Sequence, residues 1–371
     1  MFVNFHLSPS NAHDGPEGRK WIKNATVLSE LVIILMGLIL CTTVHQERNW
    51  FRISSLEVPI IASKDLGLFY ILSIDGGGIR GFFPAAILKH IETELKVPLR
   101  ERFNMFAGTS TGSIIAAFLA CGANMDKVAG VYRDDGPSIF SRRRFWGPRV
   151  FEPAIRSRYR QRRLREALAP LLGNVTLGSV EVPLVLPATD IGKGEAHLFR
   201  SGYAVDKNED LQVPLVDAVI ASCSAPTYFD PTRIGNTLLA DGGLWANSPA
   251  LAAVIEARQT LDITLENIRV LSLGTGHSPT GYGLIEQKHW GFINGWRGTE
   301  FVDFLMFLQT RSTHNYLEML LDKKQFLRLS FESETPLNLD DCSIMEDLET
   351  KAREVFRESR EKIRRFLDVG L

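Results

Sequence analysis

The sequence lacks the residue patterns that identify several common classes of protein. Its four cysteines include no pair at C-x-x-C spacing, and none of its eight histidines pairs at the spacing of metal ligands. These absences argue against a metal site and favour reduced thiols in a cytosolic protein. A formal net charge of −1 and the lack of any nucleic-acid motif exclude nucleic acid as an expected partner.

Long uncharged apolar runs are also scarce, which restricts how the chain could cross a membrane. The run Leu31–Val44 is shorter than the ~20 apolar residues that a spanning helix needs. A buried or interfacial helix and a membrane anchor are the two interpretations that remain, because the small residues of a lipoprotein cleavage site are missing before Cys41. We expect residues 1–66 to form an N-terminal extension, or an overlong translation start, before a single domain at 67–371 with C-terminal helices.

The remaining chain alternates between apolar strands and amphipathic helices. Phe69–Ile74 and Phe103–Ala107 are apolar runs that each end in a glycine-rich turn followed by a helical pattern. This alternation predicts a three-layer α/β/α fold with a mainly parallel central sheet. Further strands are expected at Pro183–Asp190, Ala196–Ser201, Thr237–Ala240 and Ile268–Leu273, and helices at Gly112–Cys121, Asp126–Tyr132, Leu215–Ala221, Pro249–Gln259, Thr299–Leu321 and Ser343–Leu367, the last opened by a capping box of Ser343 and Glu346.

The second glycine-rich turn, Gly108–Gly112 (GTSTG), matches the pattern G-x-S-x-G. At the end of a strand this pattern places the serine on a sharp turn before a helix, with its hydroxyl exposed. Glycine is needed on both sides because a Cβ there would collide with the neighbouring strand or helix. Ser110 is therefore the candidate nucleophile, and it needs a nearby base.

The first turn, Gly76–Gly81 (GGGIRG), offers backbone N–H groups that no side chain screens. The N–H groups of Gly76, Gly77 and Gly78 could stabilise a developing oxyanion. The same glycines also match the dinucleotide fingerprint G-x-G-x-x-G. Glu101 lies at the spacing of a ribose ligand, but it precedes the second strand rather than ending it, which argues against this alternative.

Two residue types compete for the role of base. Asp241 starts a D-G-G turn, Asp241–Gly243, directly after an expected strand, where α/β active sites place their functional groups. A Ser–Asp–His triad would instead use His277, His289 or His314. The residues themselves leave both arrangements open.

Ten arginines gather between Arg142 and Arg165, interleaved with aromatic residues. A solvated helical face with a linker is the plain interpretation. The alternative is a surface that binds anions such as phospholipid headgroups or a nucleotide.

Taken together, DGGGIRG from Asp75 to Gly81, GTSTG from Gly108 to Gly112 and DGG from Asp241 to Gly243 resemble the patatin-like phospholipases. The resemblance covers about Phe69–Gly276 and implies a Ser–Asp dyad that hydrolyses lipid acyl esters. It implies Ser110 as nucleophile, Asp241 as proton acceptor and the Gly76–Gly78 backbone as oxyanion hole, with Arg80 supporting it. It also implies that His277 is a bystander and that neither a metal ion nor another cofactor takes part.

A narrower resemblance, carried by Leu186–Phe199, Leu271–Gly276, Trp290–Trp296 and the C-terminal helices, is to bacterial patatin effectors of antiphage signalling. It implies a cytoplasmic enzyme that degrades membrane phospholipid when a cyclic dinucleotide activates it. The expected partners are thus a phospholipid membrane, a cyclic dinucleotide and a second copy of the chain. A nucleotide-gated regulatory protein, with hydrolysis secondary, is the alternative.

Overall fold

The computed structural model describes residues 67–96, 98–141, 156–204, 208–278, 299–335 and 337–368, all within one compact unit formed by residues 61–371. The expectations for residues 1–66, including the apolar segment 31–44, lie outside the described residues. Among the residues that are described, no helix combines the length and the apolar character needed to cross a membrane.

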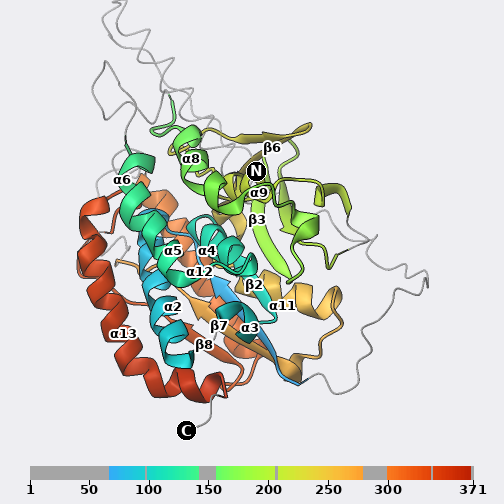
Figure 1. Ribbon diagram of the computed structural model, residues 1–371, viewed down its shortest axis with the longest axis vertical. Helices are drawn as coiled ribbons and strands as arrows, with labels where there is room; N and C mark the ends of the chain where they lie inside the picture. The colour runs from blue at the N-terminus through green and yellow to red at the C-terminus, as the bar shows by residue number, and fades with distance from the viewer. Residues whose placement is uncertain are drawn as a thin grey trace, which may run out of the picture. The chain divides into compact units, whose positions relative to one another are not determined.

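A sheet in the order β5-β6-β3-β2-β1-β7-β8, with β4 paired to β3, forms the middle of the fold (Figure 1). Neighbouring pairs from β3 through β2, β1 and β7 to β8 are parallel, whereas β4, β5 and β6 pair antiparallel at one side. The strands are β1 (Phe69–Ile74), β2 (Met105–Gly108), β3 (Leu184–Asp190), β4 (Glu195–Arg200), β5 (Thr232–Ile234), β6 (Thr237–Asp241), β7 (Ile268–Leu273) and β8 (Phe326–Leu329). The expected mainly parallel α/β sheet is therefore confirmed.

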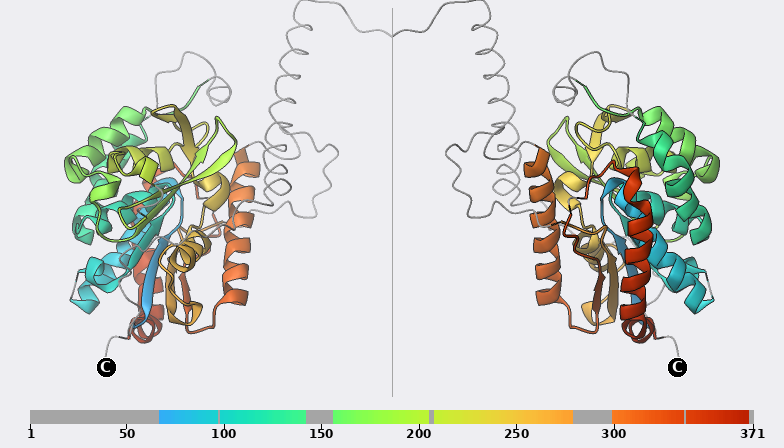
Figure 2. Two further views of the ribbon diagram at one scale, coloured as in Figure 1. Left: turned by 90° about the vertical axis from the view of Figure 1, so that its right-hand side faces the viewer. Right: turned by 90° about the vertical axis from the view of Figure 1, so that its left-hand side faces the viewer.

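Helices cover both faces of this sheet, as the two side views in Figure 2 show. The helices are α2 (Phe82–Leu95), α3 (Leu99–Arg102), α4 (Thr111–Ala120), α5 (Met125–Gly130), α6 (Gly136–Ile139), α8 (Gln161–Leu172), α9 (Leu215–Ser222), α10 (Gly243–Ala246), α11 (Ala250–Gln259), α12 (Thr299–Leu320) and α13 (Met345–Phe366).

Strand β1 shows why the fold has three layers. Its alternate residues Tyr70, Leu72 and Ile74 join one apolar core with α2, α4, α9 and α13. Phe69 and Ile71 point the other way, into a second core with α11 and α12. Every residue of β1 is buried, as a central parallel strand requires, so its apolar run has no polar alternation.

Two expected boundaries differ from the structure for local reasons. Strand β2 begins at Met105 rather than Phe103, because the Phe103 N–H donates to the carbonyl of Leu99 and so closes α3. The predicted capping box of Ser343 and Glu346 is wrong: Asp341 accepts hydrogen bonds from the Ser343 N–H and hydroxyl, 3.0 and 2.6 Å away. Both strand and helix are nevertheless present where they were expected.

Gly112, in the first turn of α4, packs closely against the end of β1. A Cβ on Gly112 would overlap the carbonyl oxygen of Ile74 at the end of β1. We expect Gly112→Ala to lower the free energy of unfolding by ~1–3 kcal/mol or more, the usual range for overpacking a core. Urea denaturation would measure this change.

Gly130→Ala is the matched control, because Gly130 ends α5 in helical geometry and its added Cβ would meet only the Asp134 carboxylate at 3.6 Å. That variant should be neutral or stabilised by up to ~1 kcal/mol. Equal stability of the two variants would contradict the packing described for Gly112.

Candidate active site

Ser110 lies on a strained turn between β2 and α4. Its backbone has φ 53° and ψ −123°, a conformation that residues other than glycine rarely adopt. The turn is tied to its surroundings, because the Ser110 N–H donates to the hydroxyl of Ser222 at 3.0 Å and Thr109 Oγ1 donates to the carbonyl of Ala246 at 2.6 Å. This is the nucleophile-bearing geometry that the G-x-S-x-G pattern predicts, and the Ser110 side chain remains partly exposed.

Asp241 reaches the same place from an unexpected direction. Asp241 lies at the carboxyl end of a strand, as the sequence predicts, but that strand, β6, runs antiparallel to β3. Strand β6 enters from beyond the edge of the sheet where the parallel strands end. Leu239 therefore pairs with Asp190, and Asp241 pairs with Ala188 further into the sheet. Because β6 stops there, Asp241 lies close enough to Ser110 for the serine hydroxyl to lower the pKa of its carboxyl.

Burial makes the Asp241 carboxyl a weak acid. The side chain is 3% exposed, and desolvation raises its pKa to about 7. The hydrogen bond from the Gly243 N–H to Oδ1, at 2.6 Å, and the nearby Ser110 hydroxyl oppose this rise. A carboxylate with a pKa near neutrality is better suited to accept a proton than an ordinary surface aspartate.

The first glycine turn lies next to Ser110, because a Cβ built on Gly76 would stand 3.4 Å from Ser110 Cβ. Gly76 itself differs from expectation: its N–H donates to the carbonyl of Asn247 at 2.9 Å and is therefore not free to bind a ligand. Among the described residues, the N–H groups of Gly77 and Gly78 have no protein acceptor. These two remain the candidate oxyanion donors.

Arg80 holds the second peptide of this turn. Its Nε donates to the carbonyl of Gly77 at 3.2 Å, and Nη1 donates to the carbonyl of Leu337 at 3.4 Å. Burial lowers the pKa of the Arg80 guanidinium, while the charge of Asp303 raises it. A trans peptide directs its C=O and N–H to opposite sides, so the contact with Gly77 turns the Gly78 N–H away from Arg80.

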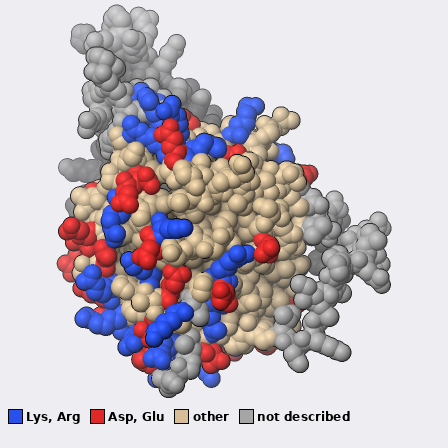
Figure 3. All heavy atoms as spheres, in the orientation of Figure 1, with Lys and Arg blue, Asp and Glu red and all other residues tan. Residues whose placement is uncertain are grey.

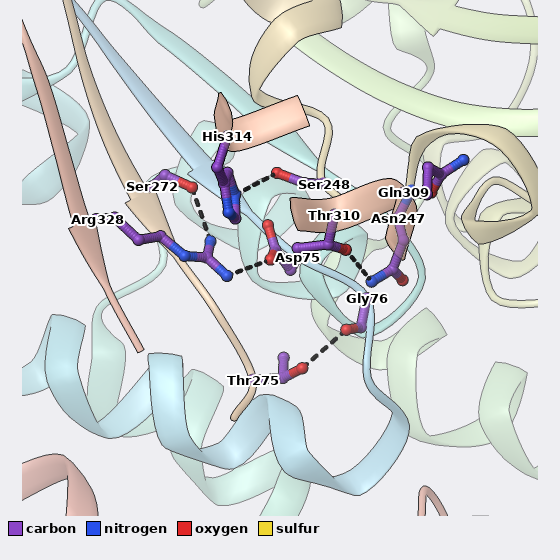
Figure 4. A network of polar contacts seen from close by, with 10 residues as sticks. All are labelled: Asp75, Gly76, Asn247, Ser248, Ser272, Thr275, Gln309, Thr310, His314 and Arg328. Atoms are coloured by element: carbon purple, nitrogen blue, oxygen red, sulfur yellow. Dashed lines mark hydrogen bonds and ion pairs between the residues drawn. The ribbon is translucent and has the colours of Figure 1, made fainter. Parts of the chain in front are cut away.

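The start of the turn belongs to a buried polar network that sequence reasoning missed (Figure 4). The side chain of Asp75 is 2% exposed, and its Oδ2 forms an ion pair with Arg328 Nη2 at 2.6 Å. Arg328 Nη1 also donates a hydrogen bond to Ser272 Oγ at 2.8 Å. Thr275 Oγ1 donates to the carbonyl of Gly76 at 2.8 Å. The sequence could have pointed to Thr275, because it lies in a G-T-G turn after an apolar strand. Nothing in the sequence distinguishes Arg328 from the other arginines.

Asn247 connects the same turn to α12. Its backbone N–H donates to Gln309 Oε1 at 2.7 Å, and its Nδ2 donates to Thr310 Oγ1 at 3.0 Å. Figure 4 shows both α12 side chains directed at Asn247. Helix α12 therefore supports the residue whose carbonyl binds the Gly76 N–H.

The candidate histidines lie apart from the dyad. His277 packs against Phe307, with ring centroids 5.0 Å apart, and its backbone N–H donates to Phe331. His314 contacts Ser248 Oγ at 3.2 Å, and burial lowers its pKa to about 4. Within the described chain, no hydrogen bond joins a histidine to Ser110 or Asp241; His289 lies outside the described residues.

Several of the described arginines in the arginine-rich stretch form ion pairs or hydrogen bonds with other residues of the chain. Arg158 pairs with Asp340 at 3.3 Å and Arg162 with Glu166 at 2.8 Å. Arg165 pairs with Asp217, and Arg163 donates to two backbone carbonyls. Basic side chains gather where α8 lies (Figure 3), but residues 142–155 lie outside the described residues, so the anion-binding alternative stays a prediction.

Comparison with known proteins was made against family models, sequences and structures. Residues 72–254 match the family model described as patatin-like phospholipase. Similar proteins include a cUMP-AMP-activated phospholipase of Escherichia coli (28% identity; 80% of this chain, 93% of the relative) and a cGAMP-activated phospholipase of Pseudomonas aeruginosa (28%; 70% and 77%). Patatin-like protein 4 of Arabidopsis thaliana is 27% identical over 80% of this chain and 83% of its own. VipD from Legionella pneumophila gives a TM-score of 0.40 at 12% identity, covering 78% and 67% of the two chains.

The proximity of the Ser110 hydroxyl to the Asp241 carboxyl gives a test of the site geometry. Because this hydroxyl lowers the Asp241 pKa, Ser110→Ala should raise that pKa above about 7. Carbon-13 NMR of labelled aspartate, followed over pH, would measure the shift.

Ser113→Ala serves as the control, since the Ser113 hydroxyl contacts the Ser110 carbonyl and Cys223. Its Asp241 carboxyl should still titrate near pH 7. An unchanged or lowered pKa in Ser110→Ala would be inconsistent with the contact.

Proposed function

We propose that the chain is a lipid acyl hydrolase that cleaves fatty-acyl esters of membrane glycerophospholipids through a dyad of Ser110 and Asp241. The match of residues 72–254 to the patatin-like phospholipase family model and the similarity to relatives described as phospholipases support this proposal. The observation that carries this proposal is the contact between a serine on a strained strand–helix turn and a buried carboxyl whose pKa is about 7. Nothing but water is required as a second substrate, and we propose that no metal ion or other cofactor takes part.

Acylation begins when Ser110 Oγ attacks the carbonyl carbon of the ester. Asp241 accepts the hydroxyl proton as the new C–O bond forms, and the carbonyl π electrons move onto its oxygen. The tetrahedral intermediate then collapses, the bond to the glycerol oxygen breaks, and Asp241 returns the proton to that leaving group. The products of this half-reaction are a lysophospholipid and an acylated Ser110.

The negative charge on the intermediate requires donors that are already in place. The N–H groups of Gly77 and Gly78 are free of protein acceptors and lie in the turn beside Ser110. One such donor contributes roughly 3–4 kcal/mol to transition-state stabilisation in comparable hydrolases. Arg80 supports this arrangement through its bond to the Gly77 carbonyl rather than by touching the substrate.

Deacylation repeats the chemistry with water as the nucleophile. Asp241 accepts a proton from water as the water oxygen bonds to the acyl carbon, and the intermediate collapses to free fatty acid. The proton passes back to Ser110 Oγ, which restores the resting enzyme. A single carboxyl can serve both halves because its raised pKa lets it gain and lose a proton near neutral pH.

We further propose that a cyclic dinucleotide activates hydrolysis at the membrane surface, as part of antiphage defence, and that the active form is a homo-oligomer. The support is the similarity to relatives described as cUMP-AMP-activated and cGAMP-activated phospholipases. A nucleotide-gated binding protein with little hydrolysis is the second candidate, favoured by the same two relatives.

Variants of the dyad provide the first test. Ser110→Ala and Asp241→Ala should each lower release of fatty acid from phospholipid vesicles by at least about 10³-fold, because nucleophile and base act in the same step. His277→Ala should retain activity, since His277 packs against Phe307 away from the dyad. Free fatty acid would be measured by mass spectrometry, and circular dichroism would show that each variant is folded.

Full activity of Ser110→Ala would overturn the proposal. If His277→Ala were as inactive as Ser110→Ala, a triad with histidine would replace the dyad.

Regulation is tested with the wild-type chain and phosphatidylglycerol-containing vesicles. Addition of cUMP-AMP or cGAMP should raise the rate of fatty-acid release and also raise the Tm, because a ligand that binds the folded state stabilises it. A rise in Tm with no gain in hydrolysis would favour the binding-protein alternative. No change in either quantity would contradict activation by these nucleotides.

A further inference from the structure

We propose that Thr275 is a positioning residue that orients the oxyanion-binding peptide through its hydroxyl. Thr275 lies directly after β7, in the turn Gly274–Gly276, and is 4% exposed. It is outside residues 72–254, the part of the chain that matches the family model. The inference rests on the proposed acyl hydrolysis at Ser110 and assigns to that reaction a residue that does not touch the substrate.

The hydrogen bond fixes the peptide that joins Gly76 to Gly77. Thr275 Oγ1 donates to the Gly76 carbonyl oxygen at 2.8 Å, and Figure 4 shows the two groups facing each other. A planar trans peptide directs its C=O and N–H to opposite sides. With the carbonyl held by Thr275, the Gly77 N–H must therefore face away from Thr275, where it has no protein acceptor.

The other end of Gly76 is held as well. Its N–H donates to the Asn247 carbonyl at 2.9 Å, so both polar groups of this glycine are bonded. Glycine is needed at the next position too, because a Cβ on Gly77 would overlap the Thr275 side chain. Thr275 thus both packs against the turn and bonds it, and the two contributions can be separated by mutation.

Without the Thr275 hydroxyl, the buried carbonyl of Gly76 would lose this hydrogen-bond donor. The peptide could then rotate to seek another partner, which would turn the Gly77 N–H away from the oxyanion. The loss would appear in the transition state, where charge develops on the substrate oxygen, and hardly at all in ground-state binding. A change in kcat with little change in KM is the expected result.

The experiment compares Thr275→Val, which keeps the shape and removes the hydroxyl, with Thr275→Ser, which keeps the hydroxyl and removes the methyl group. With a short-chain p-nitrophenyl ester, we expect Thr275→Val to lower kcat by about 10- to 100-fold, toward the loss seen when an oxyanion donor is removed. Thr275→Ser should stay within about threefold of wild type. KM should change by less than about threefold in both.

A second measurement separates orientation from general damage to the fold. The rate at which a fluorophosphonate labels Ser110 depends on the same donors, because the phosphoryl oxygen occupies the oxyanion position. Labelling should slow in Thr275→Val in parallel with kcat and remain fast in Thr275→Ser. The pH midpoint of kcat/KM should not move in either variant, since the Asp241 carboxyl is untouched.

Thr232→Val is the control for loss of a buried threonine hydroxyl elsewhere. Thr232 is 7% exposed on β5, and its hydroxyl bonds Ser224 and Gln161, each at 2.9 Å. We expect Thr232→Val to lose stability and to keep the kcat of wild type. If Thr275→Ser were as slow as Thr275→Val, packing of the methyl group would be responsible and the proposal would be wrong.

Unchanged kcat in a folded Thr275→Val variant would overturn the proposal as well. If Thr275→Val did not fold, wild-type kcat and labelling in Thr275→Ser would still support the role of the hydroxyl, and a loss there would refute it. Failure of the underlying function looks different, because wild-type protein would then show no fluorophosphonate adduct on Ser110.

Discussion

The site depends on how closely helix α4 approaches the end of strand β1. Gly112, at the start of α4, leaves no room for a Cβ beside the Ile74 carbonyl, and Gly108 is equally close to Gly112. This contact forces the turn between β2 and α4 to be sharp, and Ser110 takes a positive φ as a result. It also places Ser110 beside Gly76, where β1 ends. The proposed nucleophile and the candidate oxyanion donors are therefore brought together by one packing contact between backbones.

The base reaches this place by a different route. In an all-parallel sheet, Asp241 would lie on a strand that ends at the same edge as β2. Here β6 is antiparallel and short: it passes Asp190 at Leu239 and ends two pairs further into the sheet, with Asp241 opposite Ala188. The position is deep, so desolvation raises the pKa of the carboxyl to about 7. The antiparallel entry thus explains both where the carboxyl lies and why it is a stronger base than an exposed aspartate.

Local signals in the sequence sufficed to predict the strands other than β5 and β8, most of the longer helices and the meeting of Ser110 with the Gly76–Gly78 turn. Those features follow from apolar periodicity and from glycines at strand ends, which act within a few residues. The direction of β6, the occupied N–H of Gly76 and the contact between Arg328 and Asp75 depend instead on pairings between residues far apart in the chain. No propensity or motif reports such pairings. The capping pattern was misleading for a similar reason, because Asp341 rather than Glu346 accepts the hydrogen bond from the Ser343 N–H.

The proposed catalytic residues and the side chains that hold the glycine turn come from two different parts of the chain. Ser110 and Asp241 lie within residues 72–254, whereas the side chains that bond Asp75 and Gly76, Arg328 and Thr275, come from later strands and turns. The Leu339 carbonyl adds a third contact, accepting the Ile79 N–H at 2.9 Å. Because these groups hold the turn rather than the substrate, displacing them would weaken the proposed oxyanion binding while leaving Ser110 and Asp241 in place. Loss of the nucleophile and loss of transition-state stabilisation are therefore separable defects in this fold, although both affect the same bond-breaking step.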